Sequence, residues 1–117
     1  MITVDGTCPI IAVTKNSDHF NLWKDGGVDA ISLTVNGANA DAAGTTDLLA
    51  WVDEQIQTRE DLMLVRTAGD LRTAHRDGKL GVFHDFQGPT ALGFDLDPCL
   101  ILQDTRCRAA AGGLYYP

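Results

Sequence analysis

The stretch Lys79-Leu80-Gly81-Val82-Phe83-His84-Asp85-Phe86-Gln87-Gly88 decides the fold, because it is an apolar run of strand length that ends in polar residues and a glycine. A parallel strand buried on both faces has such a continuous apolar sequence. Residues two apart on a strand face the same way, so Phe83, Asp85 and Gln87 share one face. The stretch therefore predicts a buried parallel strand with a carboxylate and an amide at its carboxyl end.

Asp85 and Gln87 are candidate site residues, because α/β barrels place their chemistry at the carboxyl ends of their strands. The alternative is that both residues only begin a polar loop and cap the next helix, which is ordinary turn chemistry. His84 lies on the other face of the predicted strand and should turn toward helices. A satisfied packing histidine is a simpler interpretation of His84 than a metal ligand.

The rest of the chain up to this strand alternates between strand and helix patterns. Apolar or β-branched runs at 2–4, 28–35 and 62–66 predict three more strands. Capping residues and glycines predict three helices, which run from Ser17 to Gly26, from Thr45 or Thr46 onward, and from a Thr67 and Asp70 capping box to Gly78. Strands that alternate with helices predict an α/β fold with a parallel sheet of right-handed crossover units.

Composition excludes several classes of function. The chain has 117 residues, 44% of them hydrophobic, which suits one globular domain. Its net charge is -7 with nine Lys and Arg, so the basic surface of a nucleic-acid-binding protein is missing. Attraction to anionic membranes is disfavoured for the same reason. We therefore expect no nucleic-acid partner and no membrane partner.

The cysteines and the first residues of the chain indicate the cellular compartment in which we expect the protein. Cys8, Cys99 and Cys107 are an odd number without a Cys-x-x-Cys pair, which predicts neither a disulfide framework nor a zinc clip. The chain starts without a basic and apolar leader pattern, and no later window approaches twenty apolar residues. These features predict a cytoplasmic protein. No Ser-His-Asp or Cys-His arrangement is recognisable, so the sequence assigns no catalytic residue.

Several local strings occur in an order that resembles one enzyme family. They are Val4-Asp5-Gly6, residues 26–30, residues 61–72, residues 74–81, and Phe86-Gln87-Gly88 followed by Ala91-Leu92. Together they resemble the N-terminal part of the membrane dipeptidase (renal dipeptidase) family of metallopeptidases, over about residues 2–97. The string from 61 to 81 is the most specific part, since no general physical rule demands that order of residues.

The resemblance implies an amidohydrolase-type (β/α)₈ barrel with two zinc ions at its carboxyl mouth, and dipeptides as substrates. In such a site a hydroxide shared by two metals attacks the amide carbonyl while one metal polarises its oxygen. In the family the first strand ends in D-G-H-x-D, whose His and Asp bind one zinc, and a later Glu bridges both metals. Asp5 and Asp85 are the carboxylates at the corresponding mouth of this chain.

The sequence departs from the family pattern at all three of these metal-ligand positions. Thr7 stands at the His position, Pro9 at the Asp position and Gln87 at the position of the bridging Glu. Proline has no donor atom, and threonine is a poor zinc ligand beside imidazole. We therefore expect no zinc cofactor in this chain. Two functions stay open: a dipeptidase-like hydrolase with altered chemistry, or a non-catalytic half-barrel that binds a partner or has no activity.

The last residues differ in character from the rest. Residues 1–97 are interpreted as the N-terminal part of a dipeptidase-like barrel, and 98–117 as a divergent tail that shows no apolar strand pattern. A reading-frame shift at Arg106 and a natural truncation both explain the tail. A (β/α)₈ barrel needs on the order of 250 residues, so this chain supplies fewer than half of the strands. We expect it to associate with itself or with the missing barrel half.

Overall fold

The structure is a computed structural model that describes residues 1–9, 11, 14–36 and 41–88. The end of the predicted barrel segment and the predicted tail at 98–117, with its suggested frame shift, lie outside the described residues. Cys99 and Cys107 lie outside them as well. None of the described helices is both long enough and apolar enough to span a bilayer.

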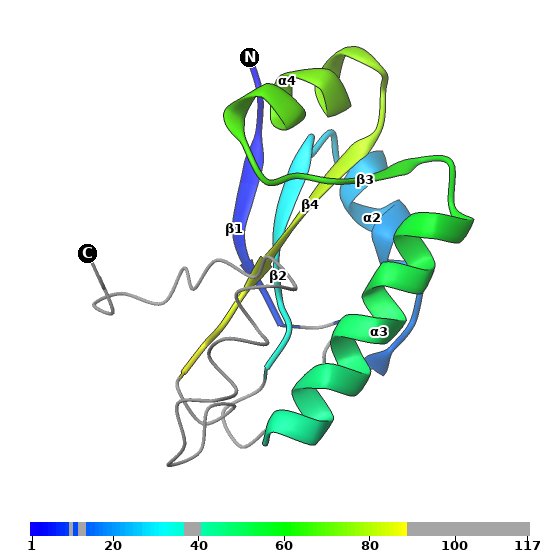
Figure 1. Ribbon diagram of the computed structural model, residues 1–117. Helices are drawn as coiled ribbons and strands as arrows, with labels where there is room; N and C mark the ends of the chain where they lie inside the picture. Colours follow the sequence, from blue (N-terminus) through cyan, green and yellow to red (C-terminus); the bar gives the residue numbers. More distant parts are fainter. Residues whose placement is uncertain (10, 12–13, 37–40, 89–117) are drawn as a thin grey trace, which may run out of the picture.

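A parallel sheet of four strands forms the centre of the described chain (Figure 1). The strands are β1 (Val4–Cys8), β2 (Ala30–Thr34), β3 (Leu62–Leu64) and β4 (Leu80–Asp85). All three strand pairings are parallel, as the alternation of strands and helices predicted. Because parallel strands point the same way, their carboxyl ends lie at one edge of the sheet.

The strands do not follow their sequence order across the sheet. The order is β1-β2-β4-β3, so β4 lies between β2 and β3. β4 pairs with β2 from Gly81 to Asp85 and with the short β3 over Leu80 to Val82. This inner position agrees with the apolar sequence of β4, since a strand lies on each side of it and the core covers one of its faces.

Three described helices connect or precede the strands: α2 (His19–Asp25), α3 (Ala42–Thr58) and α4 (Ala68–Arg76). Helix α4 begins with the predicted capping box, in which Thr67 and Asp70 bind each other's backbone N–H groups. The predicted start of α3 at Thr45 or Thr46 is wrong. Asp41 caps this helix by accepting from Gly44 N, because its carboxylate can reach the free N–H groups of the first turn.

The hydrophobic core lies between one face of the sheet and helices α2 and α3, which lie on the same side in Figure 1. The sheet contributes Ile31, Leu33 and Val82 to this core, all fully buried. Phe20 of α2 joins them, and its ring stacks on Trp51 of α3 with 6.4 Å between centroids. Aromatic pairs at such distances add to the stability gained by burying apolar area.

His84 lies on this core-facing side of β4, as predicted, and is 6% exposed. It is buried as expected for a packing residue, but it is not satisfied, since its Nε2 has no hydrogen-bond partner among the described residues. Burial lowers the pKa of His84, against a smaller opposing effect of the Asp53 charge. The imidazole is therefore neutral at pH 7.

The opposite face of the sheet is built by the alternate residues of β2 and β4, which pair as Ala30 with Gly81, Ser32 with Phe83, and Thr34 with Asp85. Near the amino-terminal end this face is tightly packed. A Cβ atom on Gly81 would stand 2.8 Å from Val65 Cγ2 and 3.1 Å from Ala30 Cβ, so only glycine fits without a shift. Polar residues follow toward the carboxyl end.

Candidate functional site

The carboxyl edge of the sheet gathers most of the predicted site residues. Thr7 and Pro9 stand at the end of β1, and Gln87 stands two residues beyond the end of β4. All three residues are exposed. β2 lies between β1 and β4, so the two groups are separated by two strand spacings, roughly 10 Å. The structure thus brings the three positions to one edge without direct contact between β1 and β4.

Asn36 fastens the end of β2 to the turn after β4. Its Oδ1 accepts from Gln87 N at 2.7 Å, and its Nδ2 donates to Gly88 O at 2.8 Å. The residue is 0% exposed, so water cannot replace these bonds at low cost. The sequence analysis did not select Asn36. The bonds join residues 51 and 52 positions apart, which no local pattern reports.

Asp85 is the buried carboxylate of this edge. It is 5% exposed, and its Oδ2 accepts a hydrogen bond from Ser32 Oγ at 2.8 Å. Its direct cross-strand neighbour is Thr34, which is 0% exposed and whose Oγ1 has no partner among the described residues. Sequence analysis selected Asp85 but not the two hydroxyl residues beside it. Their positions in β2 at period two from Ala30 were the available signal.

Asp5 is not brought together with Asp85. Asp5 pairs in register with Ile31, which belongs to the helix-covered core, and its Oδ2 accepts from Trp23 Nε1 at 2.9 Å. Hydrogen bonds from the Cys8 thiol and the Trp23 indole hold the pKa of the Asp5 carboxyl below its ordinary value. The register of β1 shifts between Asp5 and Cys8, so residues 6 and 7 face one residue of β2.

The described residues do not fit a dinuclear zinc centre. Thr7 Oγ1 donates to Gly6 O at 2.6 Å, Pro9 offers no side-chain donor atom, and Gln87 supplies a neutral amide. Cys8 is buried, and burial together with Asp5 raises the pKa of its thiol to about 12. No group of three His, Cys, Asp or Glu residues in the described part of the chain is arranged to hold a metal.

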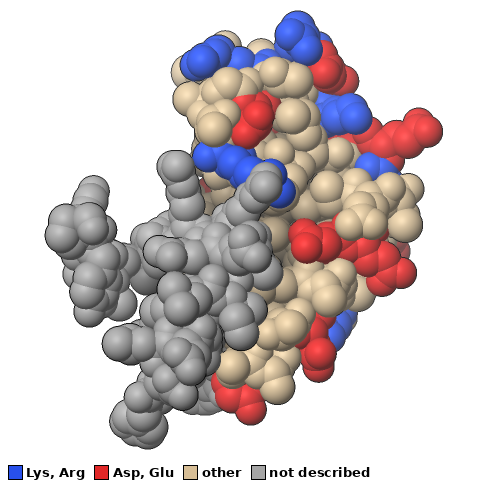
Figure 2. All heavy atoms as spheres, viewed as in Figure 1, with Lys and Arg blue, Asp and Glu red and all other residues tan. Residues whose placement is uncertain are grey.

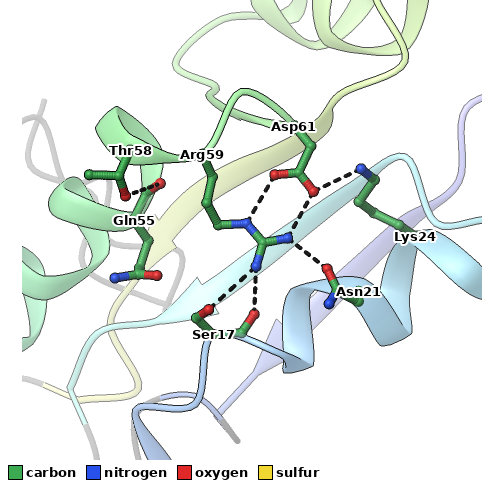
Figure 3. Close-up of polar contacts among 7 residues, drawn as sticks. All are labelled: Ser17, Asn21, Lys24, Gln55, Thr58, Arg59 and Asp61. Carbon is green, nitrogen blue, oxygen red and sulfur yellow. Dashed lines mark hydrogen bonds and ion pairs between the residues drawn. The ribbon is translucent and has the colours of Figure 1, made fainter.

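The amino-terminal end of the sheet has a contrasting polar network, drawn in Figure 3. Arg59 follows α3 and binds Asp61 with two bonds, Nε to Oδ1 at 2.9 Å and Nη2 to Oδ2 at 2.8 Å. It also donates to Ser17 O at 2.9 Å and to Asn21 Oδ1 at 2.6 Å. Lys24 of α2 completes the network by binding Asp61 Oδ2 at 2.8 Å. These bonds tie the start of β3 to α2.

A cavity of about 160 Å³ lies at the same end, lined by Lys24, Asp29, His75 and Lys79 among others. His75 Nδ1 lies 2.7 Å from Asp29 Oδ1. The basic residues stand near the carboxyl ends of α2 and α4, where helix dipoles favour cations. Barrel proteins keep stabilising rather than catalytic residues at this end. The cavity is therefore a weaker site candidate than the strand ends.

Charged side chains of both signs are interspersed on the face shown in Figure 2. Among the described residues visible there, Lys and Arg form no continuous surface.

Comparison with known proteins supports the fold. No protein-family model and no curated protein matches the sequence. An amidohydrolase from Pseudomonas aeruginosa has a similar structure, with TM-score 0.76 and 22% identity over 91% of this chain and 32% of that one. A dipeptidase, described as a metallopeptidase of family M19, has TM-score 0.72 and 14% identity over 92% of this chain and 41% of its own.

A third similar structure is a metallopeptidase from Rhodobacter sphaeroides, liganded with a phosphinate mimic of the dipeptide L-Ala-D-Ala. Its TM-score is 0.66, with 15% identity over 92% of this chain and 44% of that one. This chain thus spans less than half the length of each of the three proteins. The predicted fold class is confirmed: the described parallel sheet and helices have the α/β fold of part of each of these proteins, as expected for a partial barrel.

Proposed function

We propose that the chain belongs to the membrane dipeptidase lineage, whose activity is the hydrolysis of dipeptides, and that it does not form a dinuclear zinc centre itself. Two observations support the lineage. The string of residues 61–81 resembles the family in sequence, and two of the similar structures are peptidases. The carboxyl edge of β1, β2 and β4 is the edge at which such a barrel carries its site.

The proposal that the chain forms no dinuclear zinc centre rests on Thr7, Pro9 and Gln87. Two divalent cations at one site need anionic or imidazole ligands to offset their charge and replace their hydration shells. A hydroxyl bound to its own backbone, a proline ring and a carboxamide supply no charge at all. The chain accordingly acts at this edge as a binding surface for short peptides rather than as a metallohydrolase.

A dipeptide hydrolysis assay tests this proposal. The purified chain is incubated with L-alanyl-L-alanine and with added zinc, and free alanine is measured over time. A variant carrying Thr7→His, Pro9→Asp and Gln87→Glu, which restores the family ligands, is the comparison protein. We expect no turnover from the natural chain at any zinc concentration. Zinc-dependent turnover by the natural chain would refute the proposal.

We further propose that the exposed strand edges are completed by association, either with a second copy or with the missing barrel half. In the described residues β1 and β3 each pair with one neighbour, and Val4 of β1 is 46% exposed. Unpaired edge strands attract other strands. Size-exclusion chromatography with light scattering checks this. Oligomers are expected, and a stable, fully folded monomer would contradict the idea.

A further inference from the structure

Asp85 is a buried carboxylate that lacks a cationic partner among the described residues. None of the ion pairs in this part of the chain includes Asp85, whereas Asp29 and Asp77 each have one and Asp61 has two. Taking a carboxylate out of water is costly unless a cation or several donors replace the water. One hydrogen bond from Ser32 at 2.8 Å is a small replacement for a residue that is 5% exposed. The site therefore lacks a positive charge.

Thr34 gives independent evidence for a missing group at the same place. It is the cross-strand partner of Asp85 and is 0% exposed, yet its Oγ1 has no hydrogen-bond partner among the described residues. A buried hydroxyl without a partner costs free energy, and valine has almost the same shape without that cost. The hydroxyl beside Asp85 is thus an unused acceptor. Ser32 is a further acceptor, because its proton is donated to Asp85 and its lone pairs stay free.

We propose that Asp85, Ser32 and Thr34 form a binding site for a primary ammonium group, the amino terminus of a short peptide. An ammonium has three N–H donors, and the site offers a carboxylate and two hydroxyl oxygens on one face of adjacent strands. Ser32 and Phe83 on the same face are half-buried, whereas Asp85 and Thr34 are buried, so an ammonium group would have to enter past Ser32 and Phe83. A metal ion would require more charged ligands than a single carboxylate.

This inference rests on the proposed function, since it names the part of a short peptide that the strand ends recognise. The site needs no metal: the ammonium charge compensates Asp85, and the hydroxyls fix its orientation. Hydrogen bonds to charged groups depend strongly on both partners, so loss of one acceptor should weaken binding about tenfold. Acetylation of the amino terminus removes the charge and two donors and should weaken binding more.

Isothermal titration calorimetry of the full chain with L-alanyl-L-alanine and N-acetyl-L-alanyl-L-alanine tests the site. We expect the free dipeptide to bind and the acetylated one to bind at least about tenfold more weakly. Thr34→Val and Asp85→Asn should each weaken binding of the free dipeptide by a similar factor. Thr45→Val removes an equally buried, equally unpartnered hydroxyl from α3 and should change nothing. Asp25→Asn, an exposed charge removal, should also change nothing.

The result would overturn the inference if the natural chain bound neither peptide, if both peptides bound equally well, or if Thr34→Val bound as tightly as the natural chain. Circular dichroism monitors folding of each variant. Should Asp85→Asn fail to fold, Thr34→Val still decides, because removing an unpartnered hydroxyl is not expected to disturb the fold. Dipeptide turnover with zinc would refute the proposed function but leave these binding results unaffected, so the two failures are distinguishable.

Discussion

The two ends of the sheet differ in how completely their polar groups are paired. At the amino-terminal end the Arg59 guanidinium bonds to Asp61, Ser17 and Asn21, and Lys24 reaches the same carboxylate. At the carboxyl end Asp85 has one hydroxyl donor, and Thr34 has no partner within the described chain. Polar groups that all have hydrogen-bond partners stabilise the fold, whereas buried polar groups without partners can be satisfied by a bound ligand. This difference in pairing is the observation on which the proposed binding site at the carboxyl end rests.

Asn36→Ala should give the largest loss of stability, and it sharpens the comparison because Asn36 is the fully paired residue of the carboxyl end. The change removes both hydrogen bonds of a fully buried side chain together with its packing, at a cost of about 3 kcal/mol. Urea unfolding followed by circular dichroism measures it. Asn16→Ala is the control: Asn16 Oδ1 accepts from Asp18 N at an exposed turn, where water can replace it. Equal losses of stability in both variants would show that the two hydrogen bonds of Asn36 add no particular stability.

Arg59→Ala should give the next largest loss of folding stability, about 2 kcal/mol. The change removes two hydrogen bonds to Asp61 and the cation–π contact with Phe20. The Cζ atom of Arg59 lies 5.5 Å from the centroid of the Phe20 ring. Arg76→Ala is the matched control, since Arg76 pairs with Asp77 on the exposed surface and should not move the unfolding midpoint. If Arg59→Ala also left the unfolding midpoint unchanged, the polar network at the amino-terminal end would not stabilise the fold.

The pH dependence of stability should be set partly by His84. Burial holds its folded pKa below the unfolded value near 6.5, so the unfolded chain binds the proton first. His84 therefore supports the fold above about pH 6.5, and this support is lost as pH falls below that value toward the folded pKa. Thermal unfolding at pH 7.5 and 5.5 should show this loss in the natural chain and less of it in His84→Leu. His19→Leu should retain the loss, and an unchanged profile in His84→Leu would exclude this role.

Thr34→Val should give the smallest change, a gain in stability of up to about 1 kcal/mol, because it removes a buried hydroxyl that has no partner within the described residues. Differential scanning calorimetry measures it. A clear loss of stability would mean that the hydroxyl is already satisfied in the free protein. The carboxyl end would then be as completely paired as the amino-terminal end.

Much of the fold was predictable from local chemistry. The apolar run from Leu80 to Phe83 predicted strand β4, which continues to Asp85, and the Thr67 and Asp70 capping box starts α4 where the sequence placed it. The start of α3 was mistaken, because Asp41 lies in a run of small polar residues that offers several caps. The position of β4 between β2 and β3 was not foreseen, since sequence order does not fix which parallel strands become neighbours.

The site was predictable only in part. Asp85, Thr7, Pro9 and Gln87 stand at strand ends, which hydrophobic patterns can locate. The partnership of Ser32 and Asp85 spans 53 positions, and it depends on the register of two strands. Asp5 accepts a hydrogen bond from Trp23, next to the place where the register between β1 and β2 shifts. Such long-range and irregular features need the assembled structure, because no short pattern of residues encodes them.

The zinc content of the purified chain tests the central claim most directly. The natural chain and the variant with Thr7→His, Pro9→Asp and Gln87→Glu are dialysed together against zinc, then freed of unbound metal and measured by inductively coupled plasma mass spectrometry. The account predicts far less than one zinc per natural chain and a higher content in the variant. Stoichiometric zinc in the natural chain, with no increase in the variant, would contradict it.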